Sequence, residues 1–293
     1  MPRVSQLVVY PVKGCRGVPV ASAVPDARGL AGDRRWMVVD EAGRFLSQRT
    51  EPRLALVRAR LDTGRLVLEA PGMPALELPA QAEGPLGPVA VWNDAGPARD
   101  GGAPASRWLS RHLGRAARLV QLDETFERVA SAEFAPGARL AFTDAFPVLV
   151  IGEASLAELN RRLDRPLPMD RFRPNVVVSG AEPFAEDGWR RIRVGEAVLR
   201  LVKPCTRCVA TTVDQQSAET RPEPLRTLAT FRRWNGGGVI FGQNAMVERP
   251  GPMQVGDAVE VLETGEPAVL LPPLSPSGPA GPAPPPDARG PAR

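Results

Sequence analysis

The first hundred residues contain short apolar segments separated by turn residues, and this spacing limits the folds open to the chain. The expected strands are residues 4–12, 36–40, 44–47, 54–61 and 65–69. Glu41-Ala42-Gly43 and Asp62-Thr63-Gly64 separate two pairs of them as turns. Short strands at this spacing, broken by Gly and Asp, predict a β-meander or a small barrel, with a helix following near residues 104–114.

The second half of the chain mixes strands with helices. We expect strands at 148–151, 175–179, 191–194, 197–202 and 255–262, and helices at 154–163 and 224–233. The first helix places Leu156, Leu159 and Leu163 on one face, which is the spacing of a core-facing stripe. The hairpin of 191–202 brings residues 203–208 to a strand end, where side chains can face a ligand. The whole pattern predicts a mostly β, α+β protein with a few helices.

Composition excludes several classes of protein. The chain has 293 residues, 43% hydrophobic and 24% charged, as in a soluble globular protein. No apolar run approaches the ~20 residues that span a bilayer, and the start lacks the apolar core of a signal peptide. A net charge of +4 with 5% aromatic residues and no basic stripe disfavours nucleic-acid binding. From about Pro267 the chain is Pro-rich, which predicts a disordered tail.

Every cysteine and every lysine lies in one of two short segments, residues 10–17 and 203–208. Only Lys13 and Lys203 are lysines among 37 basic residues, and the single tyrosine, Tyr10, opens the first segment. A compact ammonium differs from a planar guanidinium in reach and hydration, so a lysine retained against this bias indicates a site that needs it. We interpret the two segments as parts of one working site that takes a small anionic ligand.

The histidine and cysteine content narrows the chemistry further. Three cysteines, an odd number, argue against a disulfide framework and favour the reducing cytoplasm. His112 is the single histidine, in a helical pattern that places it at the surface or at a helix end. A zinc site with two or three histidines is therefore excluded, and a Ser-His-Asp triad would need His112 itself.

Cys205 and Cys208 have CxxC spacing, which leaves three interpretations open. A structural zinc site would need Cys15 and His112 as its remaining ligands. A thioredoxin-type redox pair would need a helix start after the motif, where β-branched residues 211–213 stand instead. In the third, one thiolate binds a soft metal whose cofactor is held by neighbouring residues, and molybdenum in a dithiolene cofactor suits that arrangement.

Such a cofactor carries a phosphate, for which arginine forks and a lysine are suitable partners. The candidate cations are Lys13, Arg34, Arg173 and Arg207, each in a turn or strand end beside Gly or Pro or next to the cysteines. Residues 236–238, three glycines, either let backbone approach a ligand closely or end a helix with a loop.

The chain resembles the MOSC family (molybdenum cofactor sulfurase C-terminal domain) in the form that begins with a MOSC N-terminal β-barrel domain. The matching segments, in family order, are YPVKGCRG (10–17), GDRRW (32–36), FLSQRTEPRLALV (45–57), EASLAELN (153–160), FRPNVVVSG (172–180), KPCTRCVATTVD (203–214), FGQN (241–244) and VGDAVEVL (255–262). Within the family it is similar to mitochondrial amidoxime-reducing components and to bacterial reductases of N-hydroxylated bases.

The resemblance implies a β-barrel-like N-terminal domain at 1–125, a MOSC β-barrel core at 126–264, a tail at 265–293 and a bound molybdenum–pyranopterin cofactor. It implies Cys208 as the molybdenum ligand and Cys205 as a structural or spectator thiol. The implied cofactor-binding positions are Lys13, Gly14, Arg34, Ala145, Phe146, Arg173, Thr206, Arg207 and Asn244.

Three positions depart from the family pattern. Gly14 replaces a serine, so one side-chain hydrogen bond to the cofactor is missing. Ala145 and Phe146 stand where some relatives have small polar residues, which leaves only backbone contacts there. Asn244 stands where the mitochondrial form has an aromatic residue. These departures preserve cofactor binding and leave substrate preference open.

The function that the resemblance implies is reduction of small N-hydroxylated compounds, from N–OH to N–H. No cysteine follows Cys208, so electrons are expected from a separate ferredoxin or flavoprotein-type donor. The proton donor is open, with Asp187 and Asp214 as candidates, and the protein is expected to act as a monomer. The alternatives are a cofactor or sulfur carrier, as in sulfurases whose pyridoxal-phosphate domain this chain lacks the length for, and a zinc or thiol protein.

Overall fold

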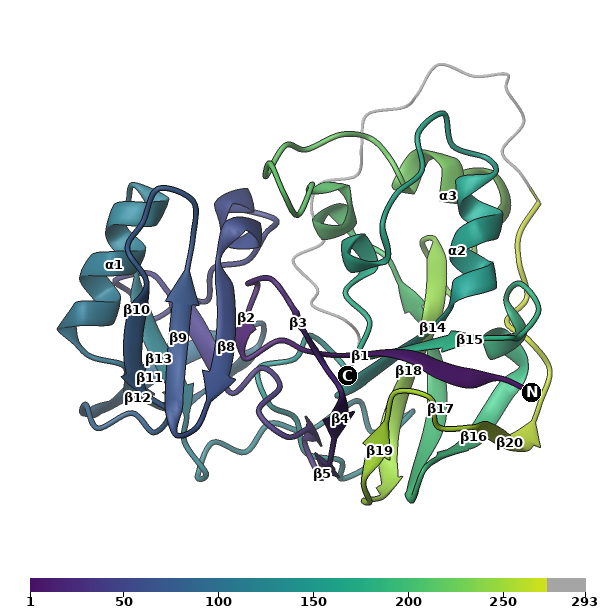
Figure 1. Cartoon of the computed structure of the whole chain (residues 1–293), viewed down its shortest axis with the longest axis horizontal. Coiled ribbons are helices and arrows are strands. Elements are labelled where there is room, and N and C mark those ends of the chain that lie inside the picture. Colours follow the sequence, from purple (N-terminus) through teal and green to yellow (C-terminus); the bar gives the residue numbers. More distant parts are fainter. Residues whose placement is uncertain (273–293) are drawn as a thin grey trace.

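The computed structural model describes residues 1–272, which form two β-rich halves lying side by side (Figure 1). An eight-stranded sheet builds the C-terminal half, and a five-stranded and a three-stranded sheet build the N-terminal half. Three α-helices lie in the described range: α1 (Ala103–Leu113), α2 (Glu153–Asn160) and α3 (Leu225–Phe231). The prediction of a mostly β protein with a few helices is confirmed. Within this range no helix is long and apolar enough to cross a membrane.

The larger sheet has the order β20-β16-β17-β18-β14-β15-β1-β3. Its strands are β1 (Arg3–Val9), β3 (Val18–Val20), β14 (Val148–Gly152), β15 (Val176–Ser179), β16 (Trp189–Val194), β17 (Ala197–Thr206), β18 (Ile240–Arg249) and β20 (Val259–Thr264). The Val4 amide donates to the Asp257 carbonyl at 2.9 Å and the Val259 amide donates to the Pro2 carbonyl at 2.8 Å. The sheet therefore closes on itself as a barrel, and the N-terminal strand completes it.

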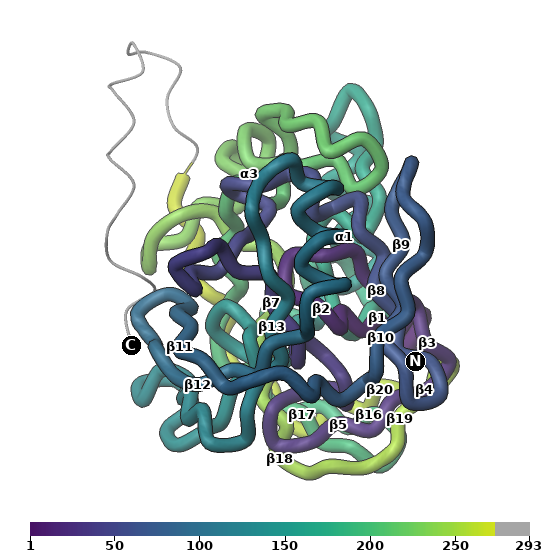
Figure 2. The backbone as a smooth tube through the Cα atoms, turned by 90° about the vertical axis from the view of Figure 1, so that its left-hand side faces the viewer, coloured from purple at the N-terminus to yellow at the C-terminus, as the bar shows by residue number. Residues whose placement is uncertain are grey.

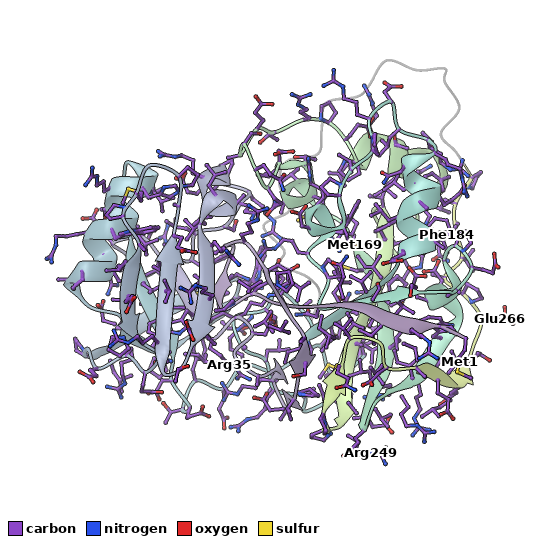
Figure 3. All side chains as sticks on the ribbon, viewed as in Figure 1. Met1, Arg35, Met169, Phe184, Arg249 and Glu266 are labelled. Atoms are coloured by element: carbon purple, nitrogen blue, oxygen red, sulfur yellow. The ribbon has the colours of Figure 1, made fainter. Side chains whose placement is uncertain are left out.

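The barrel core explains the all-apolar sequence of its inner strands. All five residues of β14 are buried, because α2 covers one face of the strand and the barrel interior the other. Phe184, labelled beside α2 in Figure 3, packs edge-on against Phe231 and Phe241, with 6.0 and 6.4 Å between ring centroids. The 3-10 turns η2 (Met169–Phe172), η3 (Ala185–Gly188) and η4 (Val209–Thr212) connect these elements.

The N-terminal half has the five-stranded order β11-β12-β13-β7-β2 and the three-stranded order β10-β9-β8. Their strands are β2 (Val12–Lys13), β7 (Trp36–Val39), β8 (Arg58–Asp62), β9 (Arg65–Glu69), β10 (Leu76–Pro79), β11 (Leu86–Val91), β12 (Asp94–Asp100) and β13 (Arg118–Leu122). Helix α1 packs against β13 and β10 (Figure 2). Two small pairs complete the structure: β4 (Ser22–Ala23) with β19 (Met253–Gln254), and β5 (Pro25–Asp26) with β6 (Gly29–Leu30).

Several local predictions are wrong in an informative way. The expected strand at 54–61 begins as a 3-10 turn, η1 (Pro52–Leu56), because Pro52 starts a helical turn that buries Leu54 and Ala55. The expected strand at 4–12 is divided between β1 and β2, which belong to different sheets. Residues 44–47 make isolated bridges only, and the closing strand starts at Val259.

His112 lies at the end of α1, as predicted, but it is not at the surface. The imidazole is buried, stacks on Trp108 at 5.8 Å and is 3.1 Å from the Arg53 carbonyl oxygen. The side chain therefore belongs to the packing of α1 on η1. The predicted Pro-rich tail lies largely outside the described residues; its first part, through Pro272, runs beside residues 233–235.

Candidate functional site

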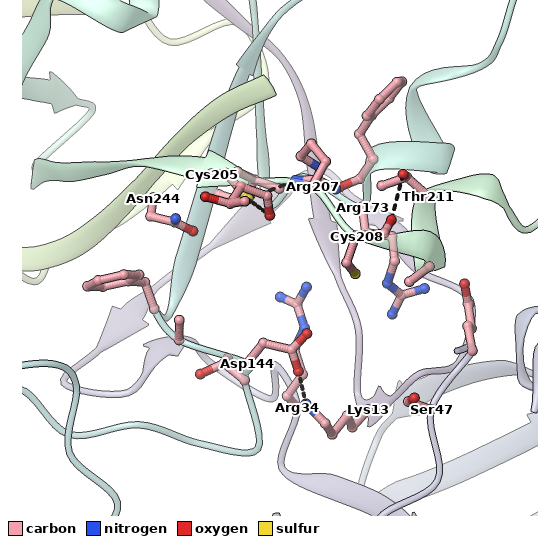
Figure 4. A pocket seen from close by; sticks show the side chains of 18 of the residues that line it. Lys13, Arg34, Ser47, Asp144, Arg173, Cys205, Arg207, Cys208, Thr211 and Asn244 are labelled. Atoms are coloured by element: carbon pink, nitrogen blue, oxygen red, sulfur yellow. Dashed lines mark hydrogen bonds and ion pairs between the residues drawn. The ribbon is translucent and has the colours of Figure 1, made fainter. Parts of the chain in front are cut away.

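A cavity of about 320 Å³ lies where the two halves meet, and both supply its walls (Figure 4). All ten residues expected at the cofactor line it: Lys13, Gly14, Arg34, Ala145, Phe146, Arg173, Thr206, Arg207, Cys208 and Asn244. The volume lies at the small end of the range for ligand pockets. Segments more than 150 positions apart in the sequence thus meet at one place.

The Tyr10 ring is placed between two guanidinium groups. The Arg34 and Arg173 guanidinium carbons lie 4.3 and 4.4 Å from its centroid, and the Tyr10 hydroxyl donates to the Pro174 carbonyl at 3.0 Å. Both arginines have left-handed backbone, with φ of 49° and 57°, which is uncommon for residues other than glycine. Arg173 also precedes a proline, where this conformation is further disfavoured. Backbone strain of this kind persists where surrounding contacts enforce it, commonly at functional sites.

Arg34 is held from behind by a buried polar network. Its Nη1 donates to Asp33, and to the Asn175 Oδ1 at 3.0 Å. Asp33 also accepts from the Tyr10 amide at 2.8 Å and from Asn175 Nδ2 at 3.1 Å. Burial raises the pKa of Asp33, although Arg34 acts against this effect. Because its members are mutually hydrogen-bonded, the network sets the direction of Arg34.

Two guanidinium atoms in the cavity wall are buried and lack a partner within residues 1–272: Arg173 Nη1 and Arg207 Nε. The other nitrogens of Arg207 donate to Cys205 Sγ at 2.8 Å and to the Phe172 carbonyl at 2.7 Å. Burial lowers the pKa of Arg173, and nearby Arg34 lowers it further. Unpaired buried donors are costly, so this wall fits an anionic ligand with several acceptor oxygens.

A second cluster of charged side chains in the cavity is formed by Lys13, Arg49 and Asp144. Lys13 Nζ donates to the Phe142 carbonyl at 2.8 Å and pairs with Asp144. Asp144 also accepts from Arg49 at 3.0 Å and from Trp92 Nε1 at 3.2 Å. These cations hold the pKa of Asp144 well below its usual range, against the opposite effect of burial. The carboxylate is therefore ionised at neutral pH.

Lys13 should leave a pH signature in the stability of the cofactor-free protein. Burial lowers its pKa to about 8 from an ordinary 10.5, and Asp144 offsets part of that effect. Between these pH values the unfolded chain holds a proton that the folded chain has released, so this contribution to the unfolding free energy rises with pH. We expect wild type to gain about 2 kcal/mol over Lys13→Met across this interval, measured by urea denaturation.

The quantity to measure is the difference in unfolding free energy between wild type and Lys13→Met. The buried Cys15 thiol is present in both proteins and lowers the unfolding free energy as pH rises, so the difference removes its contribution. Its pKa is raised to about 12, so the unfolded chain loses that proton first. Arg200→Met is the control, since a guanidinium stays charged throughout this range. A flat or falling difference between wild type and Lys13→Met would contradict the assignment.

The three cysteines have different surroundings. Cys15 is fully buried in the N-terminal core, outside the cavity. Cys205 lines the cavity, but its sulfur accepts a hydrogen bond from Arg207. Cys208 directly precedes the 3-10 turn η4, and its carbonyl accepts from the Thr211 hydroxyl at 2.9 Å. Its thiol lies near Arg49, and together with Asp144 it raises the pKa of that guanidinium against burial.

The side chains of the cavity do not form a complete set of metal ligands by themselves. Among residues 1–272, no group of three or more His, Cys, Asp or Glu side chains is arranged to hold a metal ion. The cavity instead combines a thiol with cations whose donors lack partners. This combination fits a metal that arrives with its own ligands and with an anionic group attached.

The two aspartates considered as proton donors lie outside the cavity. Asp187 accepts from Arg232 at 2.6 Å and from Gln243 at 2.7 Å, in the barrel core. Asp214 pairs with Arg171 at 2.7 Å and accepts from the backbone of the loop that follows. Among the described lining residues, the one carboxylate is Asp144.

Sequence reasoning missed several lining residues: Ser47, Gln48, Arg49, Trp92 and Asp144. Three of them have further contacts. Gln48 donates to the Gly14 carbonyl at 2.8 Å and pairs reciprocally with Gln215, while Arg49 stacks on the Trp92 ring at 4.7 Å. The matched segment 45–57 was a signal for the first three. Asp144 stands directly before Ala145, and nothing in its local pattern marks its two cationic partners.

The opposite side of the cavity is formed by β17 and β18. Lys203 and Asn244 face each other in register there, beside an irregularity in the strand pairing. Asn244 lies at one side of the pocket in Figure 4, and Arg173, Lys13 and Ser47 lie toward the other. The glycines 236–238 are not among the lining residues; they form the turn after α3, where Gly238 lies close to Thr206.

Comparison with known proteins identifies two family domains in the chain. The profile of the MOSC N-terminal beta barrel domain matches residues 1–116, and that of the MOSC domain matches residues 137–260. The two matches come from the N-terminal and C-terminal halves that meet at the cavity. The boundaries proposed from sequence, near residues 125 and 264, stay predictions.

Curated relatives match most of the chain. Mitochondrial amidoxime-reducing component 1 from Mus musculus is 38% identical over 278 residues, covering 88% of this chain and 82% of the relative. The protein of the same name from Homo sapiens is 36% identical, with 88% and 82% covered. Mitochondrial amidoxime reducing component 2 from Bos taurus is 36% identical, with 87% and 82% covered.

Proposed function

Because the chain belongs to the family of MOSC proteins that includes the amidoxime-reducing components, we propose that it is a molybdenum-cofactor-dependent reductase of N-hydroxylated compounds. The observation that carries the proposal is the pairing of one accessible thiol with unpaired buried cations. Cys208 opens onto a cavity in which Arg173 Nη1 and Arg207 Nε have no partner within residues 1–272. A phosphate-bearing cofactor with a thiolate-binding metal would satisfy both.

Each side of the cavity has a distinct part in this proposal. The Cys208 thiolate would hold the metal. Arg173, Arg207 and Arg34 would bind the phosphate and orient the pterin, and Lys13 would add a fourth charge. Bound in this way, the cofactor supplies a two-electron reduction that removes oxygen from an N–OH group. The overall reaction takes two electrons and two protons and yields N–H and water.

The residues around Cys208 define the electrostatics in which that reaction would occur. Asp144 is ionised by its contacts with Lys13 and Arg49, so at neutral pH its carboxylate accepts hydrogen bonds and does not supply a proton. Arg49 lies beside the Cys208 thiol. Trp92 and Phe45, 5.0 Å apart, cover this charged group on the N-terminal side. We propose that the electrons come from a separate donor protein.

The test is cofactor analysis joined to turnover. Protein produced in a molybdenum-replete host should carry near-stoichiometric molybdenum and pterin, and should reduce benzamidoxime to benzamidine with reduced methyl viologen as electron source. Protein from tungstate-grown cells is the matched control, with pterin present and turnover lost. Protein with neither metal nor pterin would contradict the proposal, and protein that releases cofactor readily without turnover would indicate a carrier.

A further inference from the structure

Of the two lysines in the chain, Lys203 is the one that the proposed cofactor binding leaves without a role. It lines the cavity and pairs in register with Asn244. The strand pairing is irregular between Leu201 and Lys203, and such bulges commonly redirect a side chain next to an active site. Lys203 thus lines the cavity directly beside an irregularity of β17.

Two aromatic rings hold the Lys203 ammonium in place. Its Nζ lies 4.4 Å from the centroid of Phe134 and 5.7 Å from that of Trp234. These rings come from different segments, before β14 and after α3, and they attract the cation through their faces. The aromatic contacts fix the position of the ammonium without neutralising its charge.

No carboxylate within residues 1–272 lies within 4.0 Å of Lys203, and no acceptor in this range takes a hydrogen bond from it. Most other cations of the wall have partners: Lys13 and Arg49 share Asp144, Arg34 has Asp33, and Arg207 has the Phe172 carbonyl, whereas Arg173 Nη1 lacks one within residues 1–272. Asp144 is fully engaged on the far side. Lys203 is therefore a cavity-lining lysine whose ammonium has no ion pair or hydrogen bond within residues 1–272.

We propose that Lys203 is a specificity-determining residue that binds a carboxylate on the N-hydroxylated substrate. This inference rests on the reductase function proposed above and names a substrate class for it: N-hydroxy compounds that carry an anionic group. The Lys203 ammonium would pair with that anionic group. Asn244 faces Lys203 across the strands, so its amide stands beside the same group.

The experiment compares benzamidoxime with 4-carboxybenzamidoxime on the molybdenum-loaded protein. We expect kcat/KM to be about tenfold higher for the carboxylate compound in wild type, and Lys203→Met to remove that advantage while leaving benzamidoxime turnover unchanged. Lys203→Arg should retain most of the preference. Arg200→Met, an exposed cation on the same strand outside the cavity, is the matched control and should change neither substrate.

A binding measurement makes the result independent of turnover. Calorimetric titration with 4-carboxybenzamidine, which lacks the N–OH group, should give about tenfold weaker binding to Lys203→Met, with benzamidine binding unchanged. Equal losses for both ligands, or loss of molybdenum and pterin from Lys203→Met, would overturn the inference and assign Lys203 to packing or to the cofactor. Absent turnover with an intact carboxylate preference in binding would overturn the reductase function and leave the subsite standing.

Discussion

Replacing Cys208 by serine is expected to reduce benzamidoxime turnover by more than about a hundredfold, because it removes the thiolate that would hold the metal. Changes to the outer sphere of metal sites alone cost about 10- to 100-fold, and loss of a direct ligand should exceed that. An alcohol oxygen is a poor substitute, since it is a hard ligand that stays protonated near neutral pH. The measurement is steady-state turnover per bound pterin, so that altered loading does not disguise the result.

Cys205→Ser is the matched control, three residues away in the same cavity wall. Its sulfur only accepts a hydrogen bond from Arg207, and a serine hydroxyl can accept the same bond. We expect this variant to keep turnover within a few-fold of wild type. Equal losses in the two variants would mean that the cysteines act as a pair, and near-wild-type activity in Cys208→Ser with metal retained would remove the central claim.

Replacing Arg173 by methionine should lower cofactor content by more than about tenfold and yet leave the cofactor-free protein no less stable. The guanidinium is buried, carries an unpaired Nη1 within the described residues and lies over the same ring as Arg34. An unsatisfied buried donor costs about 1–3 kcal/mol, and only the contact with Tyr10 offsets this cost. We expect the unfolding free energy of the cofactor-free protein to rise by about 1 kcal/mol, measured by urea denaturation.

Arg171→Met provides the contrast, because Arg171 lies two residues earlier and its charge is paired. It donates to Asp214 at 2.7 Å and to the Thr212 carbonyl at 3.2 Å, so its removal leaves a carboxylate and a carbonyl without a partner. We expect this variant to be destabilised by about 2 kcal/mol. A similar loss of stability in Arg173→Met would show that Arg173 serves the fold and not an anionic ligand.

The cavity concentrates features that disfavour the empty protein. Two arginines have left-handed backbone, like charges share one tyrosine ring, and two buried guanidinium donors have no partner within residues 1–272. Each feature lowers the stability of the folded protein, and favourable packing in the surrounding sheets must offset that cost. A polyanionic ligand would relieve all of them together, so ligand binding and stability should be strongly coupled in this protein.

Short-range patterns in the sequence were sufficient for the class of fold and for much of the site. Alternating apolar residues and Gly or Asp turns predicted a mostly β protein, since strand periodicity is local. The confinement of cysteine and lysine to two segments marked Lys13, Lys203 and Cys208 without any structure. The turn or strand-end context of Arg34 and Arg173 made them candidate cations, and resemblance to the MOSC family then implied that they bind a cofactor.

Only the tertiary structure decided how these groups act on one another. Arg34 and Arg173 both lie against the Tyr10 ring. Asp144 pairs with Lys13 and with Arg49, although it lies more than 90 positions after both in the sequence. The tertiary structure also places Asp187 and Asp214 outside the cavity. Among the described lining residues, Asp144 is the carboxylate. Charge pairing and burial depend on distances in space between segments that the closed barrel and its neighbour bring together, and local sequence patterns carry no record of those distances.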